Sequence, residues 1–177
     1  MNLIDIGAPT SSLAGVGTKI YIKEISAFNV IQPNMTPVAY GDERRITATH
    51  TFLDVDDGWQ TAIIAPKQSE MLAEFMGDDF TRSVKPQLKA FMPGIDPVRC
   101  QFFAELKEYL VLVPDVLCAG TRYIQIGTKC RPARIPADKV KMMGGKAEGN
   151  DPRGHEFVVE GFADGVNFYE GTITLPA

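Results

Sequence analysis

The sequence predicts a mainly β protein, an antiparallel sandwich or barrel with one α-helix packed on it. About eight segments alternate apolar and polar side chains or are short and apolar, and turn residues separate them. One segment, 96–107, carries a full set of helix signals. One stretch, Tyr109–Val113, is apolar throughout and is typical of a strand buried on both faces.

The length of 177 residues fits one domain with a sizeable core. Residues 1–16 show no sustained period, and we expect an extended N-terminal arm there, followed by a single sandwich domain over 17–177. Residues 17–25 alternate as a half-buried strand does. Residues 27–44 form a long irregular segment with Pro and Gly, and loops of that length are usually functional or disordered.

Two alternating segments, 45–53 and 59–65, flank Asp57-Gly58. Both turn residues tolerate positive φ, so the pattern predicts a hairpin. Pro66 and the helix formers after it predict a second helix over 66–76, ended by Gly77. Residues 81–92 alternate again, and Pro86 within them indicates an edge strand or a bulge.

Asp96-Pro97 provides a capping side chain and a first-turn proline for a helix that runs to about Lys107. Its apolar residues predict one buried stripe: Val98, Phe102, Phe103 and Leu106. Residues 121–129 read as the partner of the apolar strand. Residues 154–162 and 166–175 predict a closing hairpin around Asp164-Gly165, after a flexible glycine-rich loop.

Chemistry-bearing motifs are scarce in this sequence. The cysteines, Cys100, Cys118 and Cys130, are odd in number and form no CxxC pair, so we expect reduced, buried thiols. A pair such as Cys100 and His50 could meet in space, but nothing in the sequence favours that over two buried side chains. No nucleophile elbow, zinc helix or phosphate loop in its proper context occurs. We therefore expect no enzyme and no cofactor or metal, and a protein that works through its surfaces.

Charge is divided unevenly along the chain, whose net charge is −4. Residues 1–80 carry five basic and eleven acidic side chains, whereas residues 81–177 carry thirteen and eleven. Two solvated faces would explain this pattern. Alternatively, the acidic part of one copy meets the basic part of the next, and such contacts build rings or filaments. The candidate interface residues on that interpretation are Asp54, Asp56, Asp57, Glu70, Glu74, Asp78, Asp79, Arg131, Arg134, Lys139, Lys141 and Lys146.

A distinctive order of features covers roughly the last two-thirds of the chain. A polar strand ends in a Pro-Gly turn; a helix, a strand pair with Pro-Ala after its second strand, and a hairpin follow. The segments that carry this order are 77–94, Tyr109–Asp115, Arg122–Gly127 with Cys130–Ala133, and 157–171. In these segments the chain resembles the major tail tube proteins of long-tailed, siphovirus-like bacteriophages.

The resemblance implies a β-sandwich that assembles into hexameric rings, which stack into a hollow tail tube. Each copy would contribute strands to a continuous inner barrel, and double-stranded DNA would pass through its acidic lumen. The expected partners are further copies of the chain and the tape-measure, terminator and baseplate proteins. The expected location is the virion tail, assembled in the host cytoplasm, without membrane insertion.

Two other interpretations remain open at this point. The chain could be another ring protein on the same fold, from a tail terminator, a baseplate or a secretion apparatus. It could also be a ligand-binding β-barrel or an uncharacterised enzyme, which predicts a monomer with a deep pocket.

Overall fold

The computed structural model describes residues 17–77, 82–115, 122–145 and 152–177. The predicted arm, 1–16, lies outside the described residues. One α-helix, α1 (Pro97–Ala104), and four short 3-10 helices accompany twelve strands in the described part. The strands are β1 (Lys19–Glu24), β2 (Phe28–Val30), β3 (Arg45–Ile46), β4 (Thr51–Phe52), β5 (Gln60–Ile63), β6 (Glu70–Gly77), β7 (Arg82–Pro93), β8 (Tyr109–Pro114), β9 (Tyr123–Ile126), β10 (Lys141–Met143), β11 (Gly154–Glu160) and β12 (Asn167–Tyr169).

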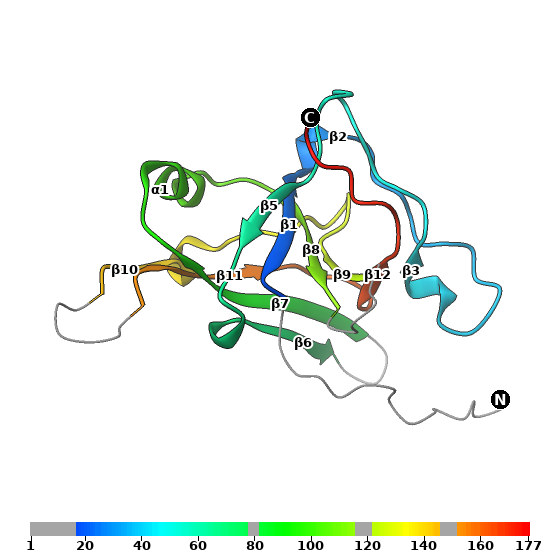
Figure 1. The fold of residues 1–177 in the computed structure, drawn as a ribbon. Coiled ribbons are helices and arrows are strands. Elements are labelled where there is room, and N and C mark those ends of the chain that lie inside the picture. Colours follow the sequence, from blue (N-terminus) through cyan, green and yellow to red (C-terminus); the bar gives the residue numbers. More distant parts are fainter. Residues whose placement is uncertain (1–16, 78–81, 116–121, 146–151) are drawn as a thin grey trace.

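Two large sheets pack face to face and confirm the predicted sandwich (Figure 1). A six-stranded sheet has the order β3-β12-β9-β8-β1-β5, and a four-stranded sheet has the order β10-β11-β7-β6. A small third sheet consists of β2 and β4. Neighbouring strands are antiparallel except for β3 and β12, which run parallel.

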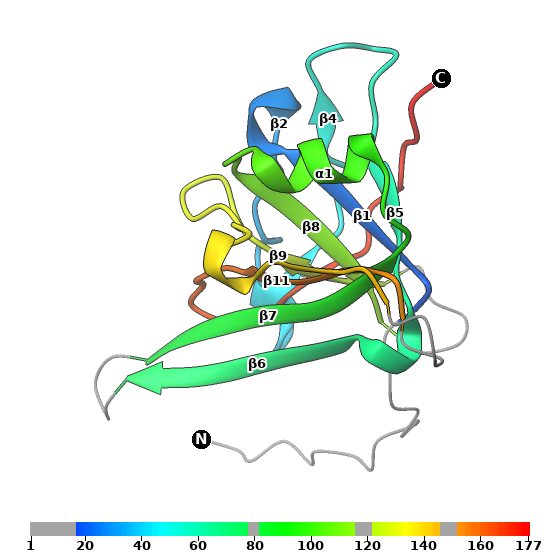
Figure 2. The same ribbon diagram turned by 90° about the vertical axis from the view of Figure 1, so that its left-hand side faces the viewer.

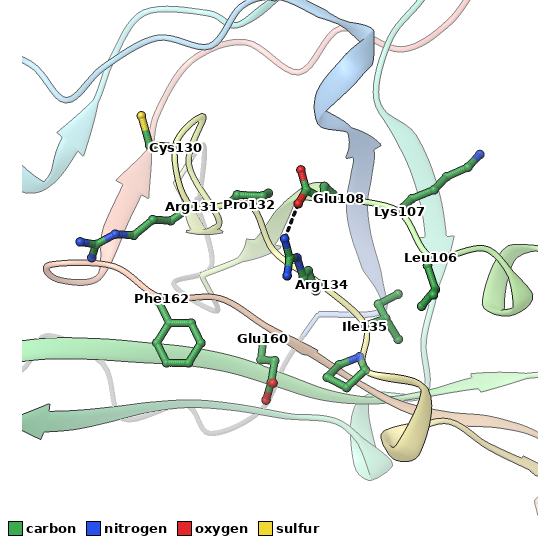
Figure 3. A pocket seen from close by; sticks show the side chains of 11 residues that line it. Leu106, Lys107, Glu108, Cys130, Arg131, Pro132, Arg134, Ile135, Glu160 and Phe162 are labelled. Carbon is green, nitrogen blue, oxygen red and sulfur yellow. Dashed lines mark hydrogen bonds and ion pairs between the residues drawn. The ribbon is translucent and has the colours of Figure 1, made fainter.

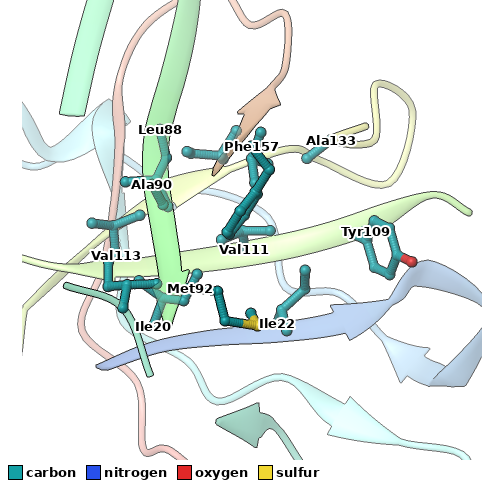
Figure 4. Packing of buried hydrophobic residues seen from close by; sticks show 13 residues of the cluster. Ile20, Ile22, Leu88, Ala90, Met92, Tyr109, Val111, Val113, Ala133 and Phe157 are labelled. Carbon is teal, nitrogen blue, oxygen red and sulfur yellow. The ribbon is translucent and has the colours of Figure 1, made fainter. Parts of the chain in front are cut away.

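Strand β8 is buried on both faces, as its apolar sequence predicts. Tyr109, Val111 and Val113 face the four-stranded sheet and contribute to the main core (Figure 4). Leu110 and Leu112 point the other way, into a second apolar cluster around Trp59 and Tyr169. Strand β8 therefore lies at the centre of the fold, between the two clusters. Burial of each such aliphatic side chain contributes about 1.5–3 kcal/mol.

Helix α1 begins as predicted and ends early. The Asp96 carboxylate accepts a hydrogen bond from the Arg99 amide at 2.9 Å, and Pro97 occupies the first turn. The helix stops at Ala104 because the chain must be extended by Glu108, whose carbonyl accepts from the Ile25 amide at 2.9 Å, to enter β8.

The predicted buried stripe of α1 holds for only two of its four residues. Phe102 and Phe103 pack on the main core, and they contact Tyr109 on β8 and Phe157 on β11. The helix therefore bridges the two large sheets (Figure 2). Val98 and Leu106 are exposed, because a helix of eight residues ends before Leu106 and turns Val98 away from the sheets.

The predicted helix over 66–76 is wrong. Only Pro66–Gln68 forms a short 3-10 turn, and residues 70–77 are strand β6. Eight residues of β6 pair with β7, from Glu70 opposite Lys89 to Gly77 opposite Arg82. This long ladder of non-local hydrogen bonds outweighs the modest helix propensity of the segment.

Both hairpins predicted from Asp-Gly turns are also wrong. The segment 45–53 splits into β3 and β4; β4 pairs with β2, whereas β5 pairs with β1. Strand β11 joins the four-stranded sheet and β12 the six-stranded sheet. In a sandwich, successive strands often belong to different sheets. An Asp-Gly turn therefore predicts that the chain reverses, but not that the two strands beside it pair with each other.

Pro86 does not mark an edge strand, because β7 lies between β6 and β11. Its carbonyl accepts from the Gly161 amide at 3.1 Å, just beyond the end of β11, where Glu160 lies opposite Gln87. The amide and carbonyl of one strand residue point to the same side of the strand. The nitrogen of Pro86, which has no proton to donate, therefore faces the point where β11 ends.

The prediction of buried thiols is wrong for two of the three cysteines. Cys100 on α1 and Cys130 are reduced and exposed. Cys130 lies in the tight turn in which the Thr128 amide bonds the Arg131 carbonyl, on the surface after β9. Cys118 lies outside the described residues.

Candidate subunit interface

The two edges of the four-stranded sheet are the most prominent candidate interface. Strand β10, of three residues, forms one edge, and β6, of eight residues, forms the other. In the described part of the chain, no strand pairs with the outer side of either. An exposed strand edge presents a row of backbone donors and acceptors and is a template for pairing with another chain.

The register shows which backbone groups of β6 point outward. Val84 exchanges hydrogen bonds with Ala163 on the β11 side of β7, at 2.7 and 2.9 Å. Every second residue of β7 directs its amide and carbonyl toward β11 in the same way. The β6 partners of these residues turn their own amides and carbonyls away from β7. These partners are Met71, Ala73 and Phe75.

Strand β6 is also unusually apolar for a strand at an edge. The Phe75 side chain is 76% exposed and the Met76 side chain is 37% exposed. Figure 2 shows β6 and β7 running together past the body of the sandwich, so the distal half of β6 has no second layer over it. Natural edge strands are usually blunted by charge or proline, and this one carries only Glu70 and Glu74.

The outer face of the four-stranded sheet carries charges that alternate between strands. The Glu160 carboxylate contacts Lys85 and Lys139, each at 2.8 Å, and Glu70 lies 3.8 Å from Lys89. Burial acts to raise the pKa of Glu160, but hydrogen bonds from Lys139 and Lys85 outweigh it and lower that pKa. The acids and bases here neutralise one another, so this face is not the strongly acidic wall expected of a tube lumen.

The structure divides the acidic candidate residues between two places. Asp54, Asp56 and Asp57 lie in the loop after β4, and Asp57 forms an ion pair with Lys23. Glu70 and Glu74 lie on β6, at the opposite end of the molecule (Figure 2). The two groups do not form one acidic face. Asp78 and Asp79 lie outside the described residues.

Most of the basic candidate residues already have acidic partners within the chain. Arg131 contacts Asp164 at 3.0 Å, Arg134 pairs with Glu108, and Lys139 binds Glu160. Lys141 is exposed on β10 and has no ion pair within the described residues. Lys146 lies outside them. Exposed pairs such as Arg131 with Asp164 contribute about 1 kcal/mol or less, so they can be exchanged for contacts with a neighbour.

A groove of about 730 Å³ lies beside the Arg134–Glu108 pair (Figure 3). Leu106, Pro132, Ile135 and Phe162 give it apolar walls. Leu106 is 85% exposed and Phe162 is 47% exposed, so the groove is open to solvent. Its size suits a small ligand or the side chains of another protein.

The sequence-based candidates include Glu70 and Glu74 on β6 but omit the apolar residues between and beside them, because the segment was interpreted as a helix. One signal was present: Met71, Ala73 and Phe75 alternate with Glu70 and Glu74, which is the period of a strand. In the described residues, no three His, Cys, Asp or Glu side chains are grouped as a metal site requires. None of the described helices has the length and apolar character that a membrane span needs.

Comparison of the chain with known protein families, with curated proteins and with solved structures finds no match.

Proposed function

We propose that the chain is a structural protein that assembles with itself into hexameric rings, which stack as a phage tail tube. The observation that supports this most is the four-stranded sheet with its two outer edges, β6 and β10. Pairing of β6 of one copy with β10 of the next would extend the sheet from subunit to subunit. A closed ring of such sheets would pair both edges of the four-stranded sheet, which would account for a long apolar strand at one of them.

The charges on the two edges support the same pairing. Glu70 and Glu74 on β6 lie on the outer face of the sheet, because they are opposite Lys89 and Lys85. Lys141 on β10 lies on that same face, opposite Glu156. When β6 meets β10 of a neighbour, acidic and basic side chains come to lie across the new strand pair, and such pairs stabilise it by about 0.2–1 kcal/mol each.

The proposal is tested by sedimentation and negative-stain electron microscopy of the purified chain over a range of concentrations. We expect rings with six-fold symmetry and tubes made of stacked rings. Closed rings that never stack would instead identify a terminator or baseplate component. A monodisperse monomer at high concentration would overturn both assignments.

The groove lined by Leu106 and Phe162 favours a second candidate, a ligand-binding module. Its volume lies within the range of roughly 300–1,000 Å³ that is typical of small-molecule sites. This candidate predicts a monomer whose melting temperature rises with an apolar ligand. Substitution of Phe162 by Ala would remove that rise without changing the oligomeric state.

A further inference from the structure

An exposed thiol and a buried imidazole meet where α1 packs on β11. The Cys100 sulfur lies 3.8 Å from Nε2 of His155. Cys100 is exposed to solvent, whereas His155 is only 2% exposed. The pair considered from the sequence, Cys100 with His50, does not form, because His50 Nε2 bonds Gln125 at 3.0 Å in the second apolar cluster.

Neighbouring side chains hold the two groups in this arrangement. Phe103 lies one turn after Cys100 on the same helix face, and its ring stacks on His155 at 4.9 Å with an interplanar angle of 28°. The start of the helix is fixed by Asp96, whose carbonyl accepts from the Cys100 amide at 3.1 Å. The sulfur is therefore held at the edge of a ring whose face is covered.

The hydrogen bonding of His155 is incomplete. Nδ1 is buried and has no partner among the described residues, so the Cys100 sulfur is the one polar contact found for this ring. Buried polar groups in proteins are nearly always paired, and an unpaired one calls for a functional or structural reason. A neutral imidazole in this position can accept a proton from the thiol.

We propose that Cys100 is a site of reversible covalent modification by disulfide exchange, with His155 as the group that accepts its proton. The ligand class is a low-molecular-weight disulfide, RS–SR. The Cys100 sulfur attacks one sulfur of RS–SR, a Cys100–S–SR bond forms, and the RS–SR bond breaks. The thiol proton passes to Nε2 of His155 and then to the departing RS⁻, which leaves as RSH, so that atoms and electrons balance.

Cys130 provides an internal control. It is also reduced and exposed. The sequence contains two histidines, and both are engaged elsewhere, His50 with Gln125 and His155 with Cys100. Cys130 therefore has exposure without a proton acceptor of this kind.

The test treats the full chain with oxidised glutathione at neutral pH and follows the modification of each cysteine by peptide mass spectrometry. We expect Cys100 to react roughly a hundredfold or more faster than Cys130, the lower end of what a positioned general base contributes. The substitution His155→Gln should bring the Cys100 rate close to that of Cys130 and leave Cys130 unchanged. Circular dichroism and thermal melting establish that the variant is folded.

Equal rates at Cys100 and Cys130 in the native wild-type protein would overturn the proposal. An unchanged Cys100 rate in folded His155→Gln would overturn it as well. If that variant does not fold, the ratio of the two wild-type rates decides the question. Assembly state is recorded in parallel, and the labelling is carried out at a concentration at which the chain is a monomer, so that the two rates do not depend on tube formation.

Discussion

Ala73 on β6 lies directly opposite Pro86 on β7, the residue that has no amide proton to donate. The Pro86 carbonyl points toward Gly161 on the far side of β7, so Ala73 receives no ladder hydrogen bond from its opposite residue. The amide and carbonyl of Ala73 are instead directed to the outer edge of the sheet. At this pair, the backbone carbonyl of Pro86 bonds within the fold, whereas the backbone groups of Ala73 are available to a neighbouring copy.

Substitution of Ala73 by Pro should prevent assembly while leaving the fold intact. Proline removes an outward donor, and edge positions of this kind tolerate it. We expect a monomer by sedimentation, with a free energy of unfolding within about 1 kcal/mol of the wild type. The matched control is Leu72→Pro, which removes a hydrogen bond to β7 and should cost about 1–3 kcal/mol. Normal tubes from Ala73→Pro would exclude β6 as an intersubunit edge.

Charge at the two edges should affect assembly in a compensating manner. Lys141→Glu places like charges across the proposed β6–β10 contact and should slow tube formation. Adding Glu74→Lys should restore it in part, because the opposite signs are exchanged rather than lost. Light scattering measures both rates, and Arg134→Glu, in a residue already paired with Glu108, serves as the comparison. Equal behaviour of the single and double variants would argue against this contact.

Salt should weaken assembly only partially. At about 1 M salt the screening length falls to roughly 3 Å, so exposed ion pairs between copies lose most of their attraction. Backbone pairing along β6 and burial of Phe75 are not screened in this way. We expect slower assembly and a higher critical concentration, but not complete dissociation. Assembly that is independent of salt would show that the divided charge of the sequence has no role between copies.

Stability should fall on mild acidification because of His50. Burial lowers the pKa of His50, and the hydrogen bond with Gln125 offsets this only in part. The Gln32 amide donates to Nδ1 at 3.0 Å, so a proton on Nδ1 would break that bond. In the unfolded chain His50 is protonated near pH 6.5, whereas in the folded chain it is protonated only at lower pH. The free energy of unfolding is therefore at its full value above about pH 6.5 and declines below it.

Urea unfolding at about pH 7.5 and about pH 5.5 measures this effect. The His50→Gln variant, which cannot titrate, is the control and should show a smaller loss between the two values. A wild-type protein that is equally stable at both would contradict the assignment of His50 as a buried neutral side chain.

Gly58 should not tolerate alanine, for a reason of space. A Cβ at this position would lie 2.5 Å from the Leu175 carbonyl carbon and 2.6 Å from the Pro176 nitrogen. The adjacent Trp59 amide bonds the Thr174 carbonyl at 2.9 Å, so the clash would displace the C-terminal segment. We expect a loss of about 1–3 kcal/mol in Gly58→Ala and little change in Gly144→Ala, which has open space around it.

Features that depend on near neighbours along the chain follow from the sequence. Asp96-Pro97 specifies the start of α1 through its own side chain and ring, and the five apolar residues of β8 specify burial on both faces. The mainly β class follows from many such short segments. None of these needs information about distant parts of the chain.

The pairing of the strands, and which edges remain exposed, could be read only from the three-dimensional structure. Residues 70–77 have the composition of a helix, and they are a strand because β7 offers eight partners in register. Asp57-Gly58 and Asp164-Gly165 turn the chain, yet the strands after them enter other sheets. Pairing energy is gained between residues far apart in sequence, so local propensity, worth less than about 1 kcal/mol per residue, cannot select it. The candidate interface and the contact of Cys100 with His155 are both products of that non-local pairing.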